Sequence, residues 1–433
     1  MERLMKISEM ILAEARAGGA DYAHCVVRES EKREFNVDGG NFSLMRTLFD
    51  RDVAVTVLKD QRKGSVHINR FDDEAVRKAV AECIAASESA EPDPAWQFAE
   101  EPVSKDFIEG EPECDTEALF MRTKELLDNI KTRHPKILME QMITEHDTYR
   151  SVFMNSNGVT YRTTAGAYNF SLMYSAHEGE KSSSFYGSDV TVKKLDRPVI
   201  ECALIDRELS EIEKQLDPEP LSGTFTGTVL LAPAALSEIV LGTILDNFVS
   251  DSSLIEGTSI WKDKLGEKIA DECFSLALNV QSEDIVVGSH ITGEGYPAEN
   301  FDVIRDGKLT SFALSQYGAN KTGGKRAGNS SWNLCVPAGE KSLDQIIAGI
   351  EKGVLVMRFS GGQPAPSGEF SGVAKNSFLI ENGKISGALA ETMISGSVPE
   401  MLNNIRAVSS DLLKDGSVSL PYIAFDGVTI SGK

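Results

Sequence analysis

The chain has little of what membrane-bound, secreted and nucleic-acid-binding proteins need. Its 433 residues hold 44 Lys and Arg against 66 Asp and Glu, a formal net charge of −22, whereas phosphates and anionic lipids attract basic side chains. No apolar run reaches the length of about 18 residues that would predict a spanning helix. The six cysteines form no CxxC pair, which is typical of reduced thiols. We therefore expect a cytoplasmic protein without direct membrane or nucleic-acid contact.

Familiar catalytic motifs are also absent. No two of the six histidines lie within a helical turn, so no helix offers a pair of zinc ligands. His146 is flanked by carboxylates, but neighbours on a strand point to opposite faces. There is no GxSxG elbow, GANKTGGKR (318–326) is a poor match to a phosphate-binding loop, and Cys335 has no histidine nearby in sequence. A metal-independent hydrolase with unrecognised residues remains an open alternative.

The pattern of apolar and polar residues along the chain indicates an α+β fold. Apolar spacings of three and four over 2–18 predict a helix, several short β-like runs follow, and Asp72-Asp73 begins another helix. Further on, Asp115 is expected to cap a helix, and Ser342 to cap one that stops at Gly353. Because helices and hairpins do not alternate strictly, a doubly wound sheet is not expected.

Composition divides the chain into four predicted parts. Residues 1–90 are expected to form an α+β domain, and the acidic, Pro-rich residues 91–114 a linker. Residues 115–222 are predicted to hold a helix and a hairpin with an NSNG turn. Residues 223–433 are predicted to form a β-rich C-terminal domain.

One apolar stretch, LLAPAALSEIVLGTIL (230–245), is expected to end a strand, meet Pro233 and continue as a helix. It holds a single acid, Glu238, and no histidine. Its apolar residues suit burial on more than one side; they are Ala234, Leu236, Ile239, Val240, Leu241, Ile244 and Leu245.

Several glycine-punctuated polar segments follow in the second half, and strand-flanked loops of this kind can line a groove that takes an extended peptide. In order and spacing, the blocks VLLAPAALSEIVLG, EGTSIWKDKLGEKI, GEGYPAENFDVIRDGKLTSFALSQYGA, AGNSSWNLCV and GEFSGVAKNSFLIENGKI resemble the TldD/PmbA family of zinc metalloproteases, also called modulators of DNA gyrase. The resemblance covers nearly the whole chain. It implies an N-terminal α/β-sandwich-like domain followed by a large β-rich mixed domain.

In the catalytic subunits of that family, the helix after VLLAP carries His-Glu-x-x-x-His, which binds zinc and activates water. The matching positions here are Leu241, Gly242 and Asp246. Leucine and glycine offer no donor atom, and one carboxylate is a weak zinc site. The C-terminal cysteine of the catalytic type is absent as well. The resemblance is therefore to the PmbA (TldE-like) subunit without the metal.

For such a subunit the resemblance implies no cofactor of its own and zinc in a TldD-like partner. The pair would degrade or trim unfolded and precursor peptides as a dimer. A non-catalytic peptide-binding or regulatory homodimer is the alternative, and the charge balance makes any gyrase link indirect. By resemblance, the residues expected to line the peptide groove are Gly257, Thr258, Ser259, Glu294, Gly295, Gly328, Asn329, Gly368, Phe370 and Ser371.

Overall fold

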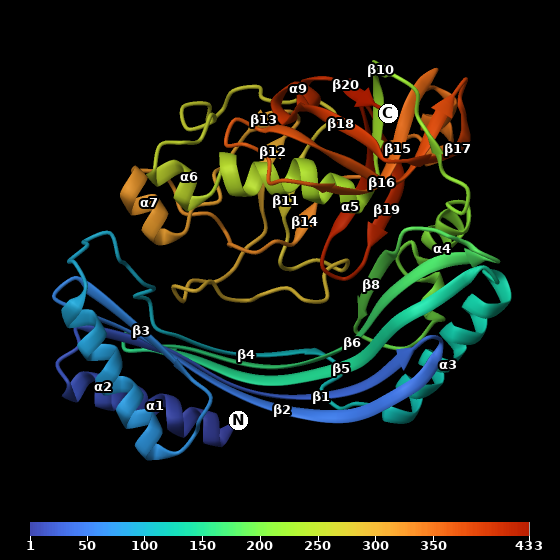
Figure 1. The fold of residues 1–433 in the computed structure, drawn as a ribbon. Helices are drawn as coiled ribbons and strands as arrows, with labels where there is room; N and C mark the ends of the chain where they lie inside the picture. Colours follow the sequence, from blue (N-terminus) through green and yellow to red (C-terminus); the bar gives the residue numbers. More distant parts are fainter. Residues whose placement is uncertain (433) are drawn as a thin grey trace.

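Two β-sheets organise the protein (Figure 1), which we describe from a computed structural model covering residues 1–432. An eight-stranded sheet from the first half of the chain curves along one side, with the strand order β3-β2-β1-β5-β6-β4 and with β7 and β8 paired to β6. A twelve-stranded sheet from the second half lies over its concave face. The mixed α+β fold class expected from the sequence is confirmed.

The first sheet is carried by four long strands, with helices at both of its ends (Figure 1). Its strands are β1 (Tyr22–Asp38), β2 (Asn41–Lys59), β3 (Arg62–Ile68), β4 (Val103–Gly110), β5 (Ile137–Asn155), β6 (Val159–Glu178), β7 (Lys181–Ser182) and β8 (Tyr186–Val192). The helices are α1 (Glu2–Ala17), α2 (Asp73–Ser89), α3 (Thr116–Arg133) and α4 (Ile205–Glu213). The side chains of Asp72 and Asp115 cap α2 and α3 as predicted.

The long strands differ from the short runs expected from the sequence. AHCVVRES and KREFNV form one strand, β1, and NFSLMRTLF and DVAVTVL form β2. Within residues 1–432, no helix covers the middle of this sheet. Charged side chains there stay solvated or pair across strands, as Lys32 does with Glu145 at 2.8 Å. Polar residues in the middle of a strand therefore do not end it.

The second sheet surrounds the largest hydrophobic core. Its strands are β9 (Glu219–Pro220), β10 (Thr224–Leu231), β11 (Leu276–Leu278), β12 (Phe301–Arg305), β13 (Lys308–Leu309), β14 (Leu334–Cys335), β15 (Lys352–Gly361), β16 (Glu369–Glu381), β17 (Lys384–Ala390), β18 (Thr392–Ser397), β19 (Ile405–Lys414) and β20 (Ser419–Ser431). The helices are α5 (Pro233–Leu236), α6 (Asp251–Ile255), α7 (Gln316–Thr322), α8 (Leu343–Ala348) and α9 (Val398–Asn403). Among residues 1–432, no helix is long and apolar enough to cross a membrane.

The prediction that the helix capped by Ser342 runs to Gly353 is wrong at its end. Ser342 does form a capping box, but α8 ends at Ala348. Gly353 instead pairs with Thr228 where β15 lies parallel to β10. A Cβ at this position would lie 2.3 Å from the Thr228 carbonyl oxygen, so the glycine serves a close approach of two strands.

Strands from three of the predicted parts share the first sheet. It includes β1 to β3 from 1–90, β4 from the predicted linker 91–114, and β5 to β8 from 115–222. β4 pairs in parallel with β6 from Val103 to Gly110. The second sheet is built from residues 223–432 together with the short β9. The domain boundaries themselves stay a prediction.

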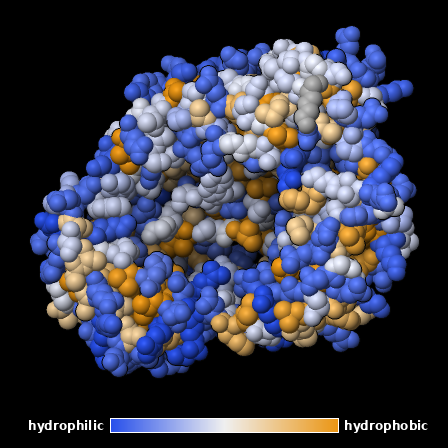
Figure 2. Space-filling model, in the orientation of Figure 1, coloured by the Kyte–Doolittle hydropathy of each residue, from blue (hydrophilic) through white to orange (hydrophobic). Residues whose placement is uncertain are grey.

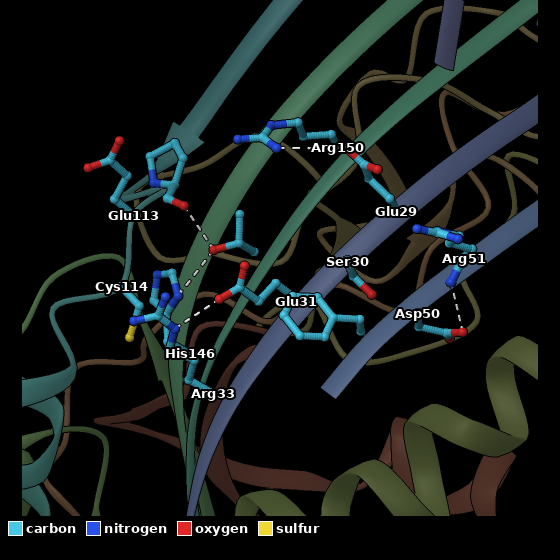
Figure 3. Close-up of a pocket in the computed structure, with 13 residues that line it drawn as sticks. Glu29, Ser30, Glu31, Arg33, Asp50, Arg51, Glu113, Cys114, His146 and Arg150 are labelled. Atoms are coloured by element: carbon cyan, nitrogen blue, oxygen red, sulfur yellow. Dashed lines mark hydrogen bonds and ion pairs between the residues drawn. The ribbon is translucent and has the colours of Figure 1, made fainter. Parts of the chain in front are cut away.

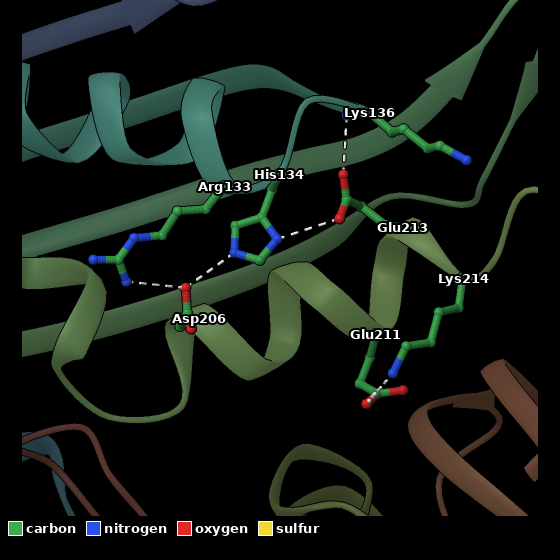
Figure 4. Close-up of polar contacts among 7 residues, drawn as sticks. All are labelled: Arg133, His134, Lys136, Asp206, Glu211, Glu213 and Lys214. Carbon is green, nitrogen blue, oxygen red and sulfur yellow. Dashed lines mark hydrogen bonds and ion pairs between the residues drawn. The ribbon is translucent and has the colours of Figure 1, made fainter.

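Helix α4 joins the two halves of the molecule. His134, directly after α3, places Nε2 3.0 Å from Asp206 Oδ1 and Nδ1 3.3 Å from Glu213 Oε2 (Figure 4). On its other side, Arg207 forms an ion pair of 2.8 Å with Asp411 of β19. The helix is thereby tied to α3 and to the C-terminal sheet.

The third contact of α4 is a buried carboxyl. Glu208 is only 6% exposed and accepts hydrogen bonds from Tyr186 (3.2 Å) and Ser188 (2.6 Å) on β8. Burial raises the pKa of this carboxyl to about 7, although both hydrogen bonds act in the opposite direction. The folded state thus holds a proton that the unfolded chain releases near its ordinary value of 4.5.

This difference makes Glu208 a source of pH-dependent stability. Its contribution is fully present below the unfolded pKa and is lost as the pH rises through the folded one. We expect the stability of the wild type relative to Glu208→Gln to fall by about 2–3 kcal/mol between pH 5 and pH 8. Burial lowers the pKa of His24 to about 4, so the contribution of His24 to stability rises with pH. His24 is present in both proteins and cancels in the comparison. Urea unfolding of both proteins at several pH values measures this difference. If the two free energies of unfolding change with pH in parallel, the expectation is wrong.

Candidate functional site

A hollow lies between the two sheets, and Figure 2 shows it at the centre of this face. Within it, a cavity of about 510 Å³ separates the first sheet from the loop 286–290 of the C-terminal half. Its walls come from β1, β4, β5, β6, β8 and that loop. The lining residues include Arg28, Glu109, Glu145, Asp147, Tyr149, Asn169, Lys193 and His290.

Polar and aromatic contacts fix the cavity walls. The His290 ring stacks on Phe107 at 3.9 Å between centroids, and its Nε2 lies 3.0 Å from Glu109 Oε1. Lys193 donates to the other Glu109 oxygen at 3.1 Å. Burial opposes ionisation of Glu109, but Lys193 and His290 outweigh it and lower the pKa of the carboxyl. The Arg28 guanidinium lies over the Tyr149 ring at 4.1 Å. The cavity therefore offers fixed charges of both signs beside aromatic surface.

The strand alternation expected around His146 is confirmed. Its neighbours Glu145 and Asp147 line the cavity in the hollow, whereas His146 points to the opposite face of the sheet. There it lines a second cavity of about 500 Å³, shown in Figure 3. Its ring nitrogens contact the Glu111 carbonyl oxygen (2.7 Å) and Thr148 (3.2 Å), and burial lowers the pKa of the imidazole. These contacts are those of a packed histidine.

The apolar stretch after β10 is helical from Pro233 to Phe248, as predicted. It contains two π-helical turns, Ser237–Leu241 and Ile244–Phe248, in which hydrogen bonds join residues five apart. In the second turn the Val249 amide donates to the Ile244 carbonyl at 3.1 Å. Sequence patterns did not predict these turns, which are rare and often found at functional sites.

The three residues that the sequence resemblance matches to a zinc motif, Leu241, Gly242 and Asp246, do not fit a zinc ion. Leu241 is fully buried in the hydrophobic core and has no donor atom. Gly242 has no side chain. Asp246 is largely exposed, and the protein atoms around its carboxyl group raise the pKa of that group by partial desolvation. Across the part of the chain that the structure describes, no three His, Cys, Asp or Glu side chains are placed to hold a metal ion.

Some of the residues predicted to line a groove lie around the end of this helix. Ser259 Oγ donates to the Phe248 carbonyl oxygen at 2.6 Å, and Thr258 Oγ1 donates to the Ser253 carbonyl oxygen. Gly257 has a left-handed φ of 71° in the same turn. A Cβ at Gly368 would lie 2.7 Å from the Phe248 ring. These residues close turns against the helix.

The candidates Glu294, Gly295 and Asn329 lie on other loops of the C-terminal half. The Glu294 carbonyl oxygen accepts from the Ala99 amide at 3.0 Å, and a Cβ at Gly295 would lie 2.8 Å from the Phe153 ring. Asn329 Nδ2 donates to the Glu299 carbonyl oxygen at 2.8 Å. These contacts hold C-terminal loops together and against the first sheet.

Three candidates complete the set. A Cβ at Gly328 would lie 2.5 Å from the Glu299 carbonyl oxygen. Phe370 is buried and meets Phe359 edge to face at 6.0 Å, whereas Ser371 is exposed. The structure thus places the candidates in separate groups rather than in one wall. Their role in peptide binding stays a prediction.

Sequence reasoning did not single out the residues that line the hollow. Arg28, Glu109, Tyr149, Lys193 and His290 are far apart in the chain and meet only through sheet pairing and a C-terminal loop. Alternation along β5 was the one usable signal, because it places Glu145, Asp147 and Tyr149 on one face.

Comparison with known families gives two matches. The family model described as "PmbA/TldA metallopeptidase C-terminal domain" matches residues 223–432. The model described as "PmbA/TldA metallopeptidase domain 1" matches residues 25–87. Among curated proteins, the metalloprotease PmbA homolog of Haemophilus influenzae is 23% identical, covering 94% of this chain and 88% of that protein. A metalloprotease TldD homolog of Buchnera aphidicola is 29% identical over 47% of this chain and 44% of its own length.

Solved structures share the fold over its whole length. TldE from Thermococcus kodakarensis superposes with a TM-score of 0.84 at 20% identity, covering 98% of this chain and all of the other. A putative modulator of a DNA gyrase from Thermotoga maritima gives a TM-score of 0.80 at 19% identity, covering 99% and 100%.

Proposed function

Since this chain belongs to the TldD/PmbA family of metallopeptidases, we propose that it is the subunit of a peptide-processing metalloprotease that carries no metal. A TldD-like partner would hold the zinc and cleave the peptide bond. This chain would supply the matching half of the complex and part of the surface that receives the peptide.

The observation that carries this proposal is the helix after β10. By resemblance, Leu241, Gly242 and Asp246 match the positions of the two zinc ligands and the general base in the catalytic subunits. Leu241 is fully buried in the hydrophobic core. A core leucine with no donor atom cannot bind or activate a metal-bound water. In this proposal the helix has a structural role only, and the partner subunit carries out the catalysis.

The proposed substrates are unfolded and precursor peptides in extended form. Support comes from the hollow, whose wall combines the sheet with charged and aromatic side chains such as Arg28, Glu109 and Tyr149. The backbone groups of the central strands are already paired within the sheet, so a peptide would be recognised here through its side chains. The net charge of −22 disfavours direct DNA contact, so any link to gyrase would be indirect.

A second candidate is a non-catalytic peptide-binding homodimer. It is favoured by the long edge of β2 that β3 leaves unpaired, which is suited to a second copy. The two candidates differ in whether a protease subunit is needed for function.

The test is reconstitution with a TldD-like subunit from the same cell. We expect the isolated chain to leave an unfolded peptide intact, and the mixture to cleave it at a rate that saturates near equal amounts of the two chains. As a control, Trp332→Ala, which changes an exposed side chain, should behave like the wild type. Cleavage by the isolated chain would contradict the proposal; if it survives a chelator, it would point to a metal-independent hydrolase.

A further inference from the structure

The cavity in the hollow has a floor of two small side chains. Ala165 and Ala167 line it from β6, where they pair with Tyr149 and Asp147 of β5. On the other side of β6, Glu109 of β4 pairs with Ala165. Residues that pair across neighbouring strands place their side chains on the same face of a sheet. The two methyl groups therefore lie between larger side chains, which leaves room over β6 for a side chain from outside.

A fixed loop forms the opposite wall of this cavity. The amides of Val286 and Val287 both donate to the Gly416 carbonyl oxygen, at 2.6 and 3.2 Å. A Cβ at Gly288 would lie 1.8 Å from the Val280 carbonyl oxygen, so the loop is closely packed behind. Val287 lines the cavity and is 50% exposed. Together with the alanine floor, it gives the cavity an apolar part.

Three carboxylates line the cavity, and one of them has no partner. Glu109 is held by a lysine and a histidine, as described above. Glu145 pairs with Lys32 at 2.8 Å. Lys32 lies directly opposite Asp147 in the register of β1 and β5, yet it reaches Glu145 instead. Within residues 1–432 the Asp147 side chain forms no hydrogen bond and no ion pair, and its Oδ1 is buried.

An unpartnered carboxylate in this place favours a cationic ligand. A buried oxygen without a hydrogen bond is unfavourable, and a donor from a bound ligand would remove that cost. Arg28 lines the same cavity, but its guanidinium lies over the Tyr149 ring at 4.1 Å and forms no ion pair with Asp147. Asp147 and Arg28 also line a neighbouring cavity of about 600 Å³ on the same face of the sheet. A peptide that lies along this face would pass Asp147.

We propose that this cavity binds a lysine or arginine side chain of the substrate peptide, with the charged end against Asp147. The alkyl stem would lie over the two alanines, between Tyr149 and Val287. Long basic side chains suit such a site because they combine an apolar stem with a charged end, whereas the ammonium of a peptide N-terminus has no stem. The inference rests on the proposed peptide-processing function and names the kind of residue that the peptide carries.

The test measures binding of short unstructured peptides to the isolated full chain by titration calorimetry. One peptide carries a single lysine and is blocked at both ends, and the other has norleucine in its place. We expect the wild type to bind the lysine peptide at least about tenfold more tightly, the effect of one charge-assisted contact. Asp147→Asn should abolish this preference without changing the affinity for the norleucine peptide. Ala167→Leu, which fills the floor, should weaken binding of both peptides.

Asp38→Asn is the matched control, because Asp38 is an exposed carboxylate at the end of β1, outside the cavity. It removes the same charge, so it measures the general attraction of cations to a chain of net charge −22. This variant should keep the preference for lysine, and circular dichroism should show an unchanged fold in all variants.

Equal affinity of the wild type for the two peptides, or an equal loss of preference in Asp38→Asn and Asp147→Asn, would overturn the proposal. If the norleucine peptide binds as tightly as the lysine peptide once its N-terminus is left free, the bound cation is the terminal ammonium and the side-chain proposal is wrong. Cleavage by the reconstituted pair without any preference for lysine or arginine would overturn this proposal and leave the proposed function standing.

Discussion

Replacing Trp261 with alanine is expected to lower the free energy of unfolding by about 3–5 kcal/mol. Trp261 is 1% exposed and lies against Phe248, the last residue of the second π-helical turn, at 4.6 Å between ring centroids. The backbone amide of Trp261 donates to Ser259 Oγ, and the Ser259 hydroxyl donates to the Phe248 carbonyl oxygen. Removing the indole would leave a cavity beneath the helix that carries Leu241 and Asp246.

Trp332→Ala is the control for that substitution. Trp332 is 52% exposed, and loss of an exposed side chain typically changes stability by less than about 0.5 kcal/mol. Urea unfolding followed by circular dichroism gives both values. Equal effects of the two substitutions would show that Trp261 does not anchor the helix.

Gly110→Ala is expected to cost about 4 kcal/mol or more, at the upper end of single substitutions. Gly110 ends β4 with a left-handed φ of 62°, and a Cβ there would lie 2.0 Å from the carbonyl oxygen of Gly166 on β6. That atom belongs to the backbone and cannot turn aside as a side chain would. Alanine would therefore separate β4 from β6 and move Glu109 in the wall of the hollow.

Gly179→Ala separates the steric effect from backbone strain. Gly179 has nearly the same φ, 64°, but a Cβ there would meet no atom within 4 Å. This control should cost only the strain of a left-handed residue, about 1–2 kcal/mol. Similar losses in both variants would mean that the Gly110–Gly166 contact does not limit stability.

Local signals in the sequence were reliable where one residue decides the structure. Asp72, Asp115 and Ser342 cap helices because their side chains accept backbone amides that the helix leaves unpaired. The turn at Asn382-Gly383 joins β16 and β17, because both residues adopt a positive φ there. Pro233 begins a helix, where its missing amide costs nothing.

Features set by distant contacts could not be predicted in this way. The fusion of β1 from two runs depends on pairing with both β2 and β5 along its length. The stop expected at Gly353 failed because that glycine serves the approach of β10 to β15. The cavity residues meet only once the C-terminal loop at 286–290 lies over the first sheet.

The candidate groove shows the same limit at the level of function. The motif blocks identified residues such as Gly295, Asn329 and Gly368, and the structure shows what fixes them: close packing and backbone hydrogen bonds. A motif block that carries the family resemblance can thus mark residues needed for the fold as well as residues of a binding site. Charged residues of the hollow, including Glu109 and His290, belong to no block that the sequence made visible.

Zinc content tests the central claim most directly. The isolated chain, produced with zinc in the medium and then dialysed, should hold far less than one zinc ion per chain by mass spectrometry of the metal. Its complex with a TldD-like subunit should hold about one per pair, in line with a single three-donor site. One tightly held zinc ion per isolated chain, together with peptide cleavage, would contradict the account.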